Sequence, residues 1–551
     1  MISKALKAKP VKQSKDNDDE NEQSDEGDLD DMDLTNKDND AMEEDEDEAE
    51  TPAQKRLRLA KSYLAKVQED VDDDIMEGEI DAQQLDRDLI AERLEKDVED
   101  AAGRTFQRVA DSFSILDVSN NIRVFKNGKK SHQLSLTCCA ISSLPITKNE
   151  RPSIFIYTAS KDAVIVKWDF WTGERIHVFP GGLKPTKRLL KTIGAKNLEN
   201  HIGHNDNILC MDSSSDGKYL VTGGVDKKIY IWSVENNSML GKFTQHRDAI
   251  SGLKFRRGHN QLYSASFDRT VKVWQVDEMS YVETLFGHQD KITSIDALSR
   301  ERCVTAGSRD KTCRLWKIPE ESQLVFRSGG GKIAGDDLVV MEDILKHEKI
   351  TTKGKGDFGG STDILAMIDD EHFVTGSDSG AISLWSTQKK KPLYTNLRAH
   401  GPGTNAKVDG KHYVTKSTEE SCCWITSLAA IPYTDLFASG SGDGYIKFWK
   451  LNESKRSFTL LNSIPMKGFV NSMSFFEAPS LDFQPPQMQK VEGSEIAVKI
   501  KTNAEIQRLI KSAPKQWYLV CVTGQEHRLG RWWKLKSSKN QVAVVSLPRL
   551  K

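Results

Sequence analysis

Seven tryptophans, each closing a similar short phrase, constrain the fold of this 551-residue chain more than any other feature. In the phrase SFDRTVKVW, Asp268 lies six residues before Trp274, and four other phrases share that spacing. In three consecutive units a His lies 28 residues before the Trp. The tryptophans are Trp168, Trp232, Trp274, Trp316, Trp385, Trp449 and Trp533. A fixed period near 42 residues is typical of an architecture in which one supersecondary unit is repeated.

Each unit predicts four short strands. In the unit that ends at Trp274, the segments SGLKF, QLYSAS, TVKVWQV and YVETLF alternate or run apolar, with turn residues between them. We therefore predict an all-β fold, a seven-bladed WD-repeat β-propeller. The longer gaps between tryptophans predict insertions rather than missing blades. These insertions lie at residues 180–203, 327–361, 401–421 and 477–513.

The recurring His and Asp residues favour a structural role. The Asp can accept hydrogen bonds from its turn and from the His, and a strand hydroxyl can hold the His. A single such pair would suggest catalysis, but repetition at one spacing indicates a structural set. The residues expected to belong to it are His204, Asp226, His246, Asp268, His288, Asp310 and Asp443.

Two features of the ring stay open in the sequence. The stretches 121–126 and 541–547 both have strand character, and either could complete the last blade. The blade that ends at Trp385 lacks a Gly-His opening and has Ser379 in place of the Asp. We expect that blade to be held less rigidly than the others.

The net charge of −3 hides a division of charge along the chain. Residues 1–50 carry −14, residues 51–105 carry −6 and residues 106–551 carry +17. This suggests either a partner with phosphates or an acidic tail that serves solubility. We predict a disordered acidic arm at 1–52, a basic cluster and amphipathic helical segment at 53–115, and the propeller at 116–551. The basic cluster KRLRLAK could also act in nuclear import.

Several kinds of chemistry have no sequence signature here. The eight cysteines form no C-x-x-C pair and are predicted to be buried free thiols of a reducing compartment. No signal peptide, membrane span, phosphate-binding loop or metal-ligand spacing is found. We therefore expect no catalytic residues, no metal, no cofactor, no small-molecule substrate and no membrane association.

The candidate binding surface is the rim that carries the turn before the first strand and the turn between the second and third strands of each blade. Most residues predicted to project there are basic and suit phosphate contact, and an aromatic ring can stack on a base. The insertion at 180–203 adds basic residues on this rim, and a basic turn follows a first strand on the opposite rim. The predicted RNA-binding residues are Lys161, Lys227, Arg247, Phe267, Arg269, Lys291, Arg309, Lys311, Arg528, Lys187, Arg188, Arg256 and Arg257.

Beyond the generic repeat, specific phrases resemble one family. The run from VETLFGHQD to ALSRERCVTAG within 261–326, and GQEHRLGRWW at 524–533, are similar to the U3 55-kDa family of WD-repeat proteins. KRLRLAKSYL (55–64), HQLSLTC (132–138) and KGFVNSMSF (467–475) extend the resemblance over about 55–547. The insertions at 327–361, 401–421 and 477–513 are longer than the family's core needs.

The resemblance implies a function that spacing alone does not. Such a protein is expected in the nucleus and nucleolus, as a non-catalytic component of the U3 small nucleolar ribonucleoprotein. It is expected to bind the box B/C region of U3 snoRNA together with a kink-turn-binding protein. It is also expected to join small-subunit processome proteins in pre-rRNA processing towards 18S rRNA. The alternative is a WD-repeat adaptor that binds proteins and makes no direct RNA contact.

Overall fold

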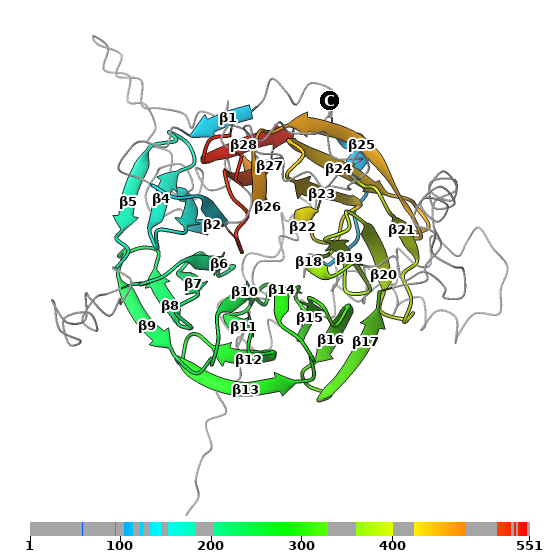
Figure 1. Ribbon diagram of the computed structural model, residues 1–551, viewed down its shortest axis with the longest axis horizontal. Coiled ribbons are helices and arrows are strands. Elements are labelled where there is room, and N and C mark those ends of the chain that lie inside the picture. The colour runs from blue at the N-terminus through cyan, green and yellow to red at the C-terminus, as the bar shows by residue number, and fades with distance from the viewer. Residues whose placement is uncertain are drawn as a thin grey trace, which may run out of the picture. The chain divides into compact units, whose positions relative to one another are not determined.

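The computed structural model forms a closed ring of seven antiparallel sheets (Figure 1). Contacts divide the chain into the units Met1–Val98 and Glu99–Lys551, and the ring belongs to the second. The predicted seven-bladed propeller is therefore confirmed. The structure describes residues 58, 94, 104–113, 122–125, 132–144, 153–182, 203–328, 360–400, 424–479, 515–530, 534–535 and 538–547.

The strands of each blade run in sequence from the axis to the outer edge in blades one to six. Blades one to three are β2 (Leu136–Leu144), β3 (Ser153–Ser160), β4 (Ile165–Asp169) and β5 (Arg175–Phe179); β6 (Ile208–Ser213), β7 (Tyr219–Gly224), β8 (Ile229–Ser233) and β9 (Met239–Phe243); β10 (Ile250–Phe255), β11 (Gln261–Ser266), β12 (Thr270–Gln275) and β13 (Ser280–Phe286). Blades four to six are β14 (Ile292–Ala297), β15 (Arg302–Gly307), β16 (Thr312–Lys317) and β17 (Ser322–Arg327); β18 (Thr362–Met367), β19 (His372–Ser377), β20 (Ile382–Ser386) and β21 (Tyr394–Asn396); β22 (Ile425–Ala430), β23 (Leu436–Ser441), β24 (Tyr445–Leu451) and β25 (Phe458–Pro465).

Blade seven joins the two ends of the ring. Its order from the axis outwards is β26 (Phe469–Pro479), β27 (Lys515–Gly524), β28 (Gln541–Leu547) and β1 (Ile122–Phe125). The stretches 121–126 and 541–547, predicted as alternatives for completing the last blade, both belong to it. β28 is the third strand, and β1 pairs with it as the fourth. The third strand is β28, which lies beyond the phrase that ends at Trp533. Trp533 itself lies outside the described residues.

Within the predicted helical segment at 53–115, apolar residues keep a helical spacing over 80–113, but residues 104–113 form no α-helix. Of this part, only Ala110–Ser112 form a turn of 3-10 helix, η1. The Asp435 carboxylate accepts the N–H groups of Val109 and Ala110 at 2.8 and 2.9 Å, and Gln107 N donates to the Tyr433 carbonyl. These backbone donors are therefore satisfied by blade six rather than by a preceding helical turn. Leu94 is helical, and the rest of that segment lies outside the described residues.

The cores of the ring lie between neighbouring blades, where the second and third strands bury their apolar side chains. In six blades the closing tryptophan donates its Nε1–H to a hydroxyl on the second strand, as Trp274 does to Ser264 at 2.8 Å. The six described cysteines are buried free thiols. Cys422, Cys423, the acidic arm at 1–52 and most of the four insertions lie outside the described residues, although β26 extends to Pro479.

Histidine and aspartate residues complete this arrangement in successive blades. His246 Nδ1 lies 2.9 Å from the Asp268 carboxylate, and His246 Nε2 lies 2.7 Å from the Ser264 hydroxyl. The same contacts link His204 to Asp226 and His288 to Asp310. In blade five, where Ser379 replaces the Asp, its hydroxyl lies 2.8 Å from the Ser377 hydroxyl. That blade also has the short outer strand β21.

Candidate nucleic-acid interface

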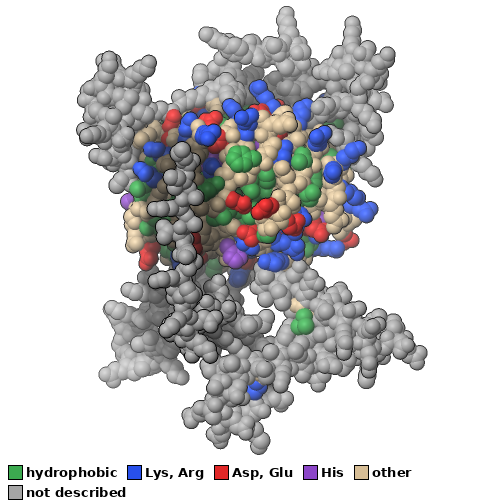
Figure 2. Space-filling view, turned by 90° about the horizontal axis from the view of Figure 1, so that it is seen from below, with side chains coloured by type: hydrophobic (Ala, Val, Ile, Leu, Met, Phe, Trp, Pro, Cys, Tyr) green, Lys and Arg blue, Asp and Glu red, His purple; other side chains and the backbone are tan. Residues whose placement is uncertain are grey.

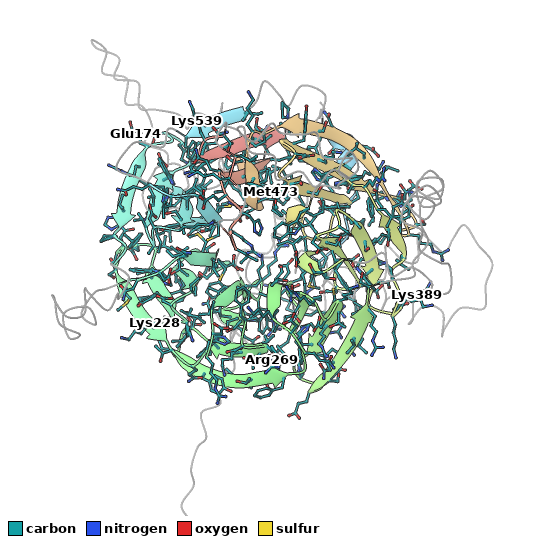
Figure 3. All side chains as sticks on the ribbon, viewed as in Figure 1. Glu174, Lys228, Arg269, Lys389, Met473 and Lys539 are labelled. Atoms are coloured by element: carbon teal, nitrogen blue, oxygen red, sulfur yellow. The ribbon has the colours of Figure 1, made fainter. Side chains whose placement is uncertain are left out.

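The top rim is the edge that carries the turns before each innermost strand and between each second and third strand. Lys227, Arg247, Arg269, Lys291 and Arg309 are all exposed there, and they come from blades two, three and four. Figure 3 labels Arg269, which lies over blade three. The structure thus brings together the predicted residues of these three blades on one arc of the ring.

The turns that hold these side chains have a common geometry. Lys227, Arg269 and Lys311 occupy equivalent positions with φ of 66°, 70° and 51°, in the left-handed region. The repeat Asp that precedes each of them stabilises the turn: Asp268 accepts the N–H and the hydroxyl of Thr270 at 3.0 and 2.6 Å. The same Asp is held by its blade's His. The structural set therefore fixes the backbone from which the basic side chains project.

Local contacts orient several of the rim side chains. Lys227 Nζ donates to the Arg247 carbonyl at 2.7 Å. Lys291 Nζ lies 5.2 Å from the centre of the Phe267 ring, which is partly exposed. A cation at this distance is attracted by the face of an aromatic ring, so the Lys291 ammonium is held above Phe267.

Acidic residues share the top rim, and the sequence analysis did not single them out. Asp206, Asp248 and Asp290 each follow a repeat His by two residues, and all are partly exposed. Asp290 also accepts the Arg309 N–H at 3.3 Å. This regular spacing was the signal that could have found them. In Figure 2, which shows the outer edge of the ring, basic, acidic and hydrophobic side chains are interspersed.

The described part of the ring carries only a small net positive charge. From residue 106 onwards, the described residues carry 36 Lys and Arg against 30 Asp and Glu, a net +6. The whole stretch 106–551 carries +17, so the segments outside the described ranges supply +11. Lys187 and Arg188 belong to those segments and lie outside the described residues. Most of the positive excess of this stretch therefore lies outside the described residues.

Lys161 does not project from the rim, contrary to the sequence prediction. Its side chain is buried, and its Nζ donates to the Gly530 carbonyl at 2.6 Å and lies 3.2 Å from the Glu526 carboxylate. These contacts link blade one to the loop between β27 and β28. Burial of a charged group requires such partners, so Lys161 serves the closure of the ring.

Arg528 also lies elsewhere than predicted, because the loop 525–530 turns into the ring, where Figure 1 shows the red trace near the centre. The buried Asn471 side chain accepts the Arg528 N–H at 3.1 Å and donates to the Glu526 carbonyl at 3.0 Å. The Arg528 guanidinium then reaches blade four, where its Nη2 donates to the Thr293 carbonyl at 3.0 Å. Burial lowers the pKa of Arg528 from its ordinary value.

Other titratable and aromatic groups lie near Arg528. The ring of His527 lies 4.1 Å from the ring of Trp424, and burial holds the pKa of His527 well below its usual range. Burial raises the pKa of Asp363, which lies on β18, to about 6, although Ser361 donates a hydrogen bond to it. The group around Arg528 therefore contains a neutral imidazole, a guanidinium and a carboxyl with reduced acidity.

The two basic residues predicted on the opposite rim differ in exposure. Arg257 is exposed. Arg256 is mostly buried: its Nε donates to the Ser299 carbonyl at 2.9 Å and its Nη1 lies 3.6 Å from the Glu301 carboxylate. Arg256 thus joins blades three and four, while Arg257 is available for contact from outside.

Two further properties follow from the described part of the chain. It contains no group of His, Cys, Asp or Glu residues placed to hold a metal ion. No helix found there has the length and apolar character needed to cross a membrane.

The comparisons with known proteins agree with the ring and its repeats. The model of the WD domain, G-beta repeat matches residues 196–233, 237–275, 279–317 and 413–450. The chain is similar to the human protein U3 small nucleolar RNA-interacting protein 2, with 42% identity over 91% of this chain and 83% of that protein. It is 32% identical to Ribosomal RNA-processing protein 9 of Saccharomyces cerevisiae, over 90% of this chain and 89% of the yeast protein.

Solved structures extend the similarity to three dimensions. The structure of U3-55K is 38% identical, with a TM-score of 0.54 over 78% of this chain and 99% of that one. The crystal structure of RRP9 WD40 repeats is also 38% identical, with a TM-score of 0.55 and 78% and 98% coverage. The repeat phrases, the ring and these relatives together show that the chain belongs to the WD-repeat family of U3 small nucleolar RNA-interacting proteins.

Proposed function

We propose that this protein is a non-catalytic RNA-binding scaffold of the U3 small nucleolar ribonucleoprotein. The observation that carries the proposal is the arc of five exposed basic side chains on blades two to four, in a chain whose human relative is named for interacting with U3 small nucleolar RNA. Arg and Lys side chains on rigid turns suit phosphate oxygens, which dominate the affinity of proteins for nucleic acids.

The finer assignment follows the family. The RNA is the box B/C region of U3 snoRNA, bound together with a kink-turn-binding protein. The protein then acts among small-subunit processome proteins in pre-rRNA processing towards 18S rRNA, in the nucleus and nucleolus. The name of the yeast relative, Ribosomal RNA-processing protein 9, supports this role. No reaction is assigned to the chain, because its recurrent His, Asp and hydroxyl groups bond to one another within the blades.

The test is a gel-shift titration of box B/C RNA at several salt concentrations with the triple variant Arg247→Ala, Arg269→Ala and Arg309→Ala. Each lost phosphate contact should weaken binding and reduce the slope of log affinity against log salt by about 0.7 to 0.9. The matched control replaces Lys389, Lys390 and Lys391, which are exposed between β20 and β21 (Figure 3 labels Lys389), and removes the same charge.

An unchanged affinity and slope in the rim variant would remove the top rim from the proposal. Equal losses in both triple variants would indicate a response to net charge rather than to position. The adaptor alternative predicts that the set of captured partners survives nuclease treatment intact, whereas the RNA-binding scaffold should lose at least part of it.

A further inference from the structure

Phe286 is the most exposed large hydrophobic side chain in the described part of the chain. It is 70% exposed, compared with 51% for Val282 on the same strand. Phe286 ends β13, the outer strand of blade three, and pairs with Thr270 at the start of β12. Burying an aromatic ring is energetically favourable, and Phe286 does not gain this free energy within the described chain. A partner that covers the ring beside the top rim would gain it.

The backbone that carries Phe286 is held firmly. Gly287 follows it, and a Cβ on that residue would come within 2.6 Å of the Arg314 guanidinium and 3.1 Å of the Trp316 ring. The next residue, His288, is buried and bonds to Asp310 at 2.8 Å. The ring of Phe286 is therefore presented from a strand end that is fixed against blade four, and it needs little ordering when it binds.

Cationic groups lie near this ring along the top of blade three. Arg269 immediately precedes Thr270, the strand partner of Phe286, and its side chain makes no hydrogen bond or ion pair with another described residue. Lys291 is held above the ring of Phe267 in the turn that leads from β13 to β14. Blade three thus presents an exposed aromatic face together with two exposed positive charges.

This combination fits one class of ligand. A base in a duplex is already stacked on both sides and cannot cover an outside ring, whereas an unpaired base can lie on it. Its flanking phosphates need cations nearby, and Arg269 and Lys291 lie on the two top-rim turns that adjoin the end of β13. An acidic peptide could satisfy the two cations but would need a separate apolar side chain to cover Phe286, whereas one nucleotide carries both the flat face and the anion.

We infer that the top of blade three binds an unpaired stretch of RNA, with one base stacked on Phe286 and the flanking phosphates held by Arg269 and Lys291. This inference rests on the proposed RNA-binding function and adds to it the form of the RNA and the residue that contacts a base. Stacking on an aromatic side chain tolerates any base, so the site selects single-stranded RNA rather than a sequence.

The test compares Phe286→Ala, Phe286→Tyr and Val282→Ala in the full chain. The probes are a single-stranded oligouridine of about 12 nucleotides and a duplex RNA of similar length. Phe286→Ala should weaken binding of the single strand roughly 5- to 150-fold, the loss expected for one stacked base. Its salt slope should stay unchanged because no phosphate contact is lost, and Phe286→Tyr should keep the affinity. Val282→Ala, on the same strand but farther from the rim, should bind like the parent.

The other outcomes distinguish failure of the inference from failure of the proposed function. If the parent binds neither probe nor U3 snoRNA, the proposed function itself fails. If the parent binds RNA and Phe286→Ala binds the single strand equally well, the inference is overturned while the function stands. If Phe286→Ala keeps its RNA affinity but loses a protein captured after nuclease treatment, Phe286 contacts protein and the inference is likewise overturned. Thermal melting of the variants checks that the ring remains folded.

Discussion

At the scale of single residues, Asp363 and Arg528 are two neighbouring charges that burial disfavours. Burial raises the pKa of Asp363 to about 6 and lowers the pKa of Arg528, while the attraction between them partly opposes both shifts. Because the folded-state pKa of Asp363 exceeds its ordinary value of 3.8, the folded chain binds a proton here more tightly than the unfolded chain does. The contribution of Asp363 to stability is complete below pH 4 and is lost as the pH rises through about 6.

Replacing Asp363 by Asn tests this reasoning. At pH 7.5 the amide avoids the cost of a buried charge, so Asp363→Asn should raise the Tm by about 2 °C, the shift expected for about 1 kcal/mol in a large domain. At pH 4 the parent carboxyl is protonated, and the two proteins should melt within about 1 °C of each other. Differential scanning calorimetry at both pH values measures the difference, with the exposed Glu278→Gln as control. A difference independent of pH would contradict the buried-charge account.

Single residues could be predicted where the number of residues between the members of a repeated set is constant. The His and Asp pairs of blades two to four follow from the sequence because no insertion separates their members. His400 was missed: it lies 2.7 Å from Asp443 and 2.8 Å from the Ser439 hydroxyl, but the insertion after it removes the usual spacing. Lys161 and Arg528 look like rim cations in a repeat alignment. Only the path of the loop 525–530 shows that Lys161 is buried and that Arg528 reaches the Thr293 carbonyl of blade four.

At the scale of elements, blade seven is assembled from both ends of the ring. β1 supplies one strand that pairs with β28 from Ile122↔Val545 to Phe125↔Val542. The buried Phe125 belongs to the core between blades seven and one, with its ring 6.0 Å from that of Trp168, while the neighbouring Val124 is 46% exposed. Side chains alternate between the two faces of a strand, so Phe125 packs into the core while Val124 is exposed. Phe125 thus holds this four-residue strand in place.

Phe125→Ala should open this closure. Loss of a buried Phe side chain typically costs about 3–5 kcal/mol, whereas Val124→Ala on the same strand should change the free energy of unfolding by less than about 0.5 kcal/mol. Denaturant unfolding measures both effects. Hydrogen exchange should also quicken in β28, whose outer partner is β1. If the amides of β28 stay as protected as in the parent, β1 does not hold the ring closed.

The sequence predicted element types well and element partners less well. Strand alternation identified both 121–126 and 541–547, but it contains no information on which position in a blade each strand takes. The helical spacing of apolar residues continued to Phe113, yet the last ten residues bind to blade six because Asp435 and the Tyr433 carbonyl satisfy their backbone donors. Tertiary hydrogen bonds therefore overrode a local pattern in that segment.

At the scale of the whole molecule, most of the positive charge from residue 106 onwards lies outside the described ring. The described ring carries +6, and the residues outside the described ranges from 106 onwards carry +11. The ring can position a few specific contacts, while the connections can add phosphate contacts that depend on charge. The composition of the sequence shows the total positive excess, but it does not show how much of that charge lies on the ring. On the top rim, acids are spaced as regularly as the bases.

The insertion at 180–203 offers a direct test of this division. It carries five basic residues against one acid, Glu199; the basic residues are Lys184, Lys187, Arg188, Lys191 and Lys196. Replacing all five by Ala should reduce the salt slope for U3 RNA by about 0.7 to 0.9 for every residue that contacts a phosphate, with no change in the Tm of the ring. The control replaces Lys407, Lys411 and Lys416 in the insertion at 401–421, where acids balance the bases. A slope that falls only in the first variant assigns contacts to the insertion at 180–203. A slope unchanged in both would leave the rim of blades two to four to account for the RNA affinity by itself.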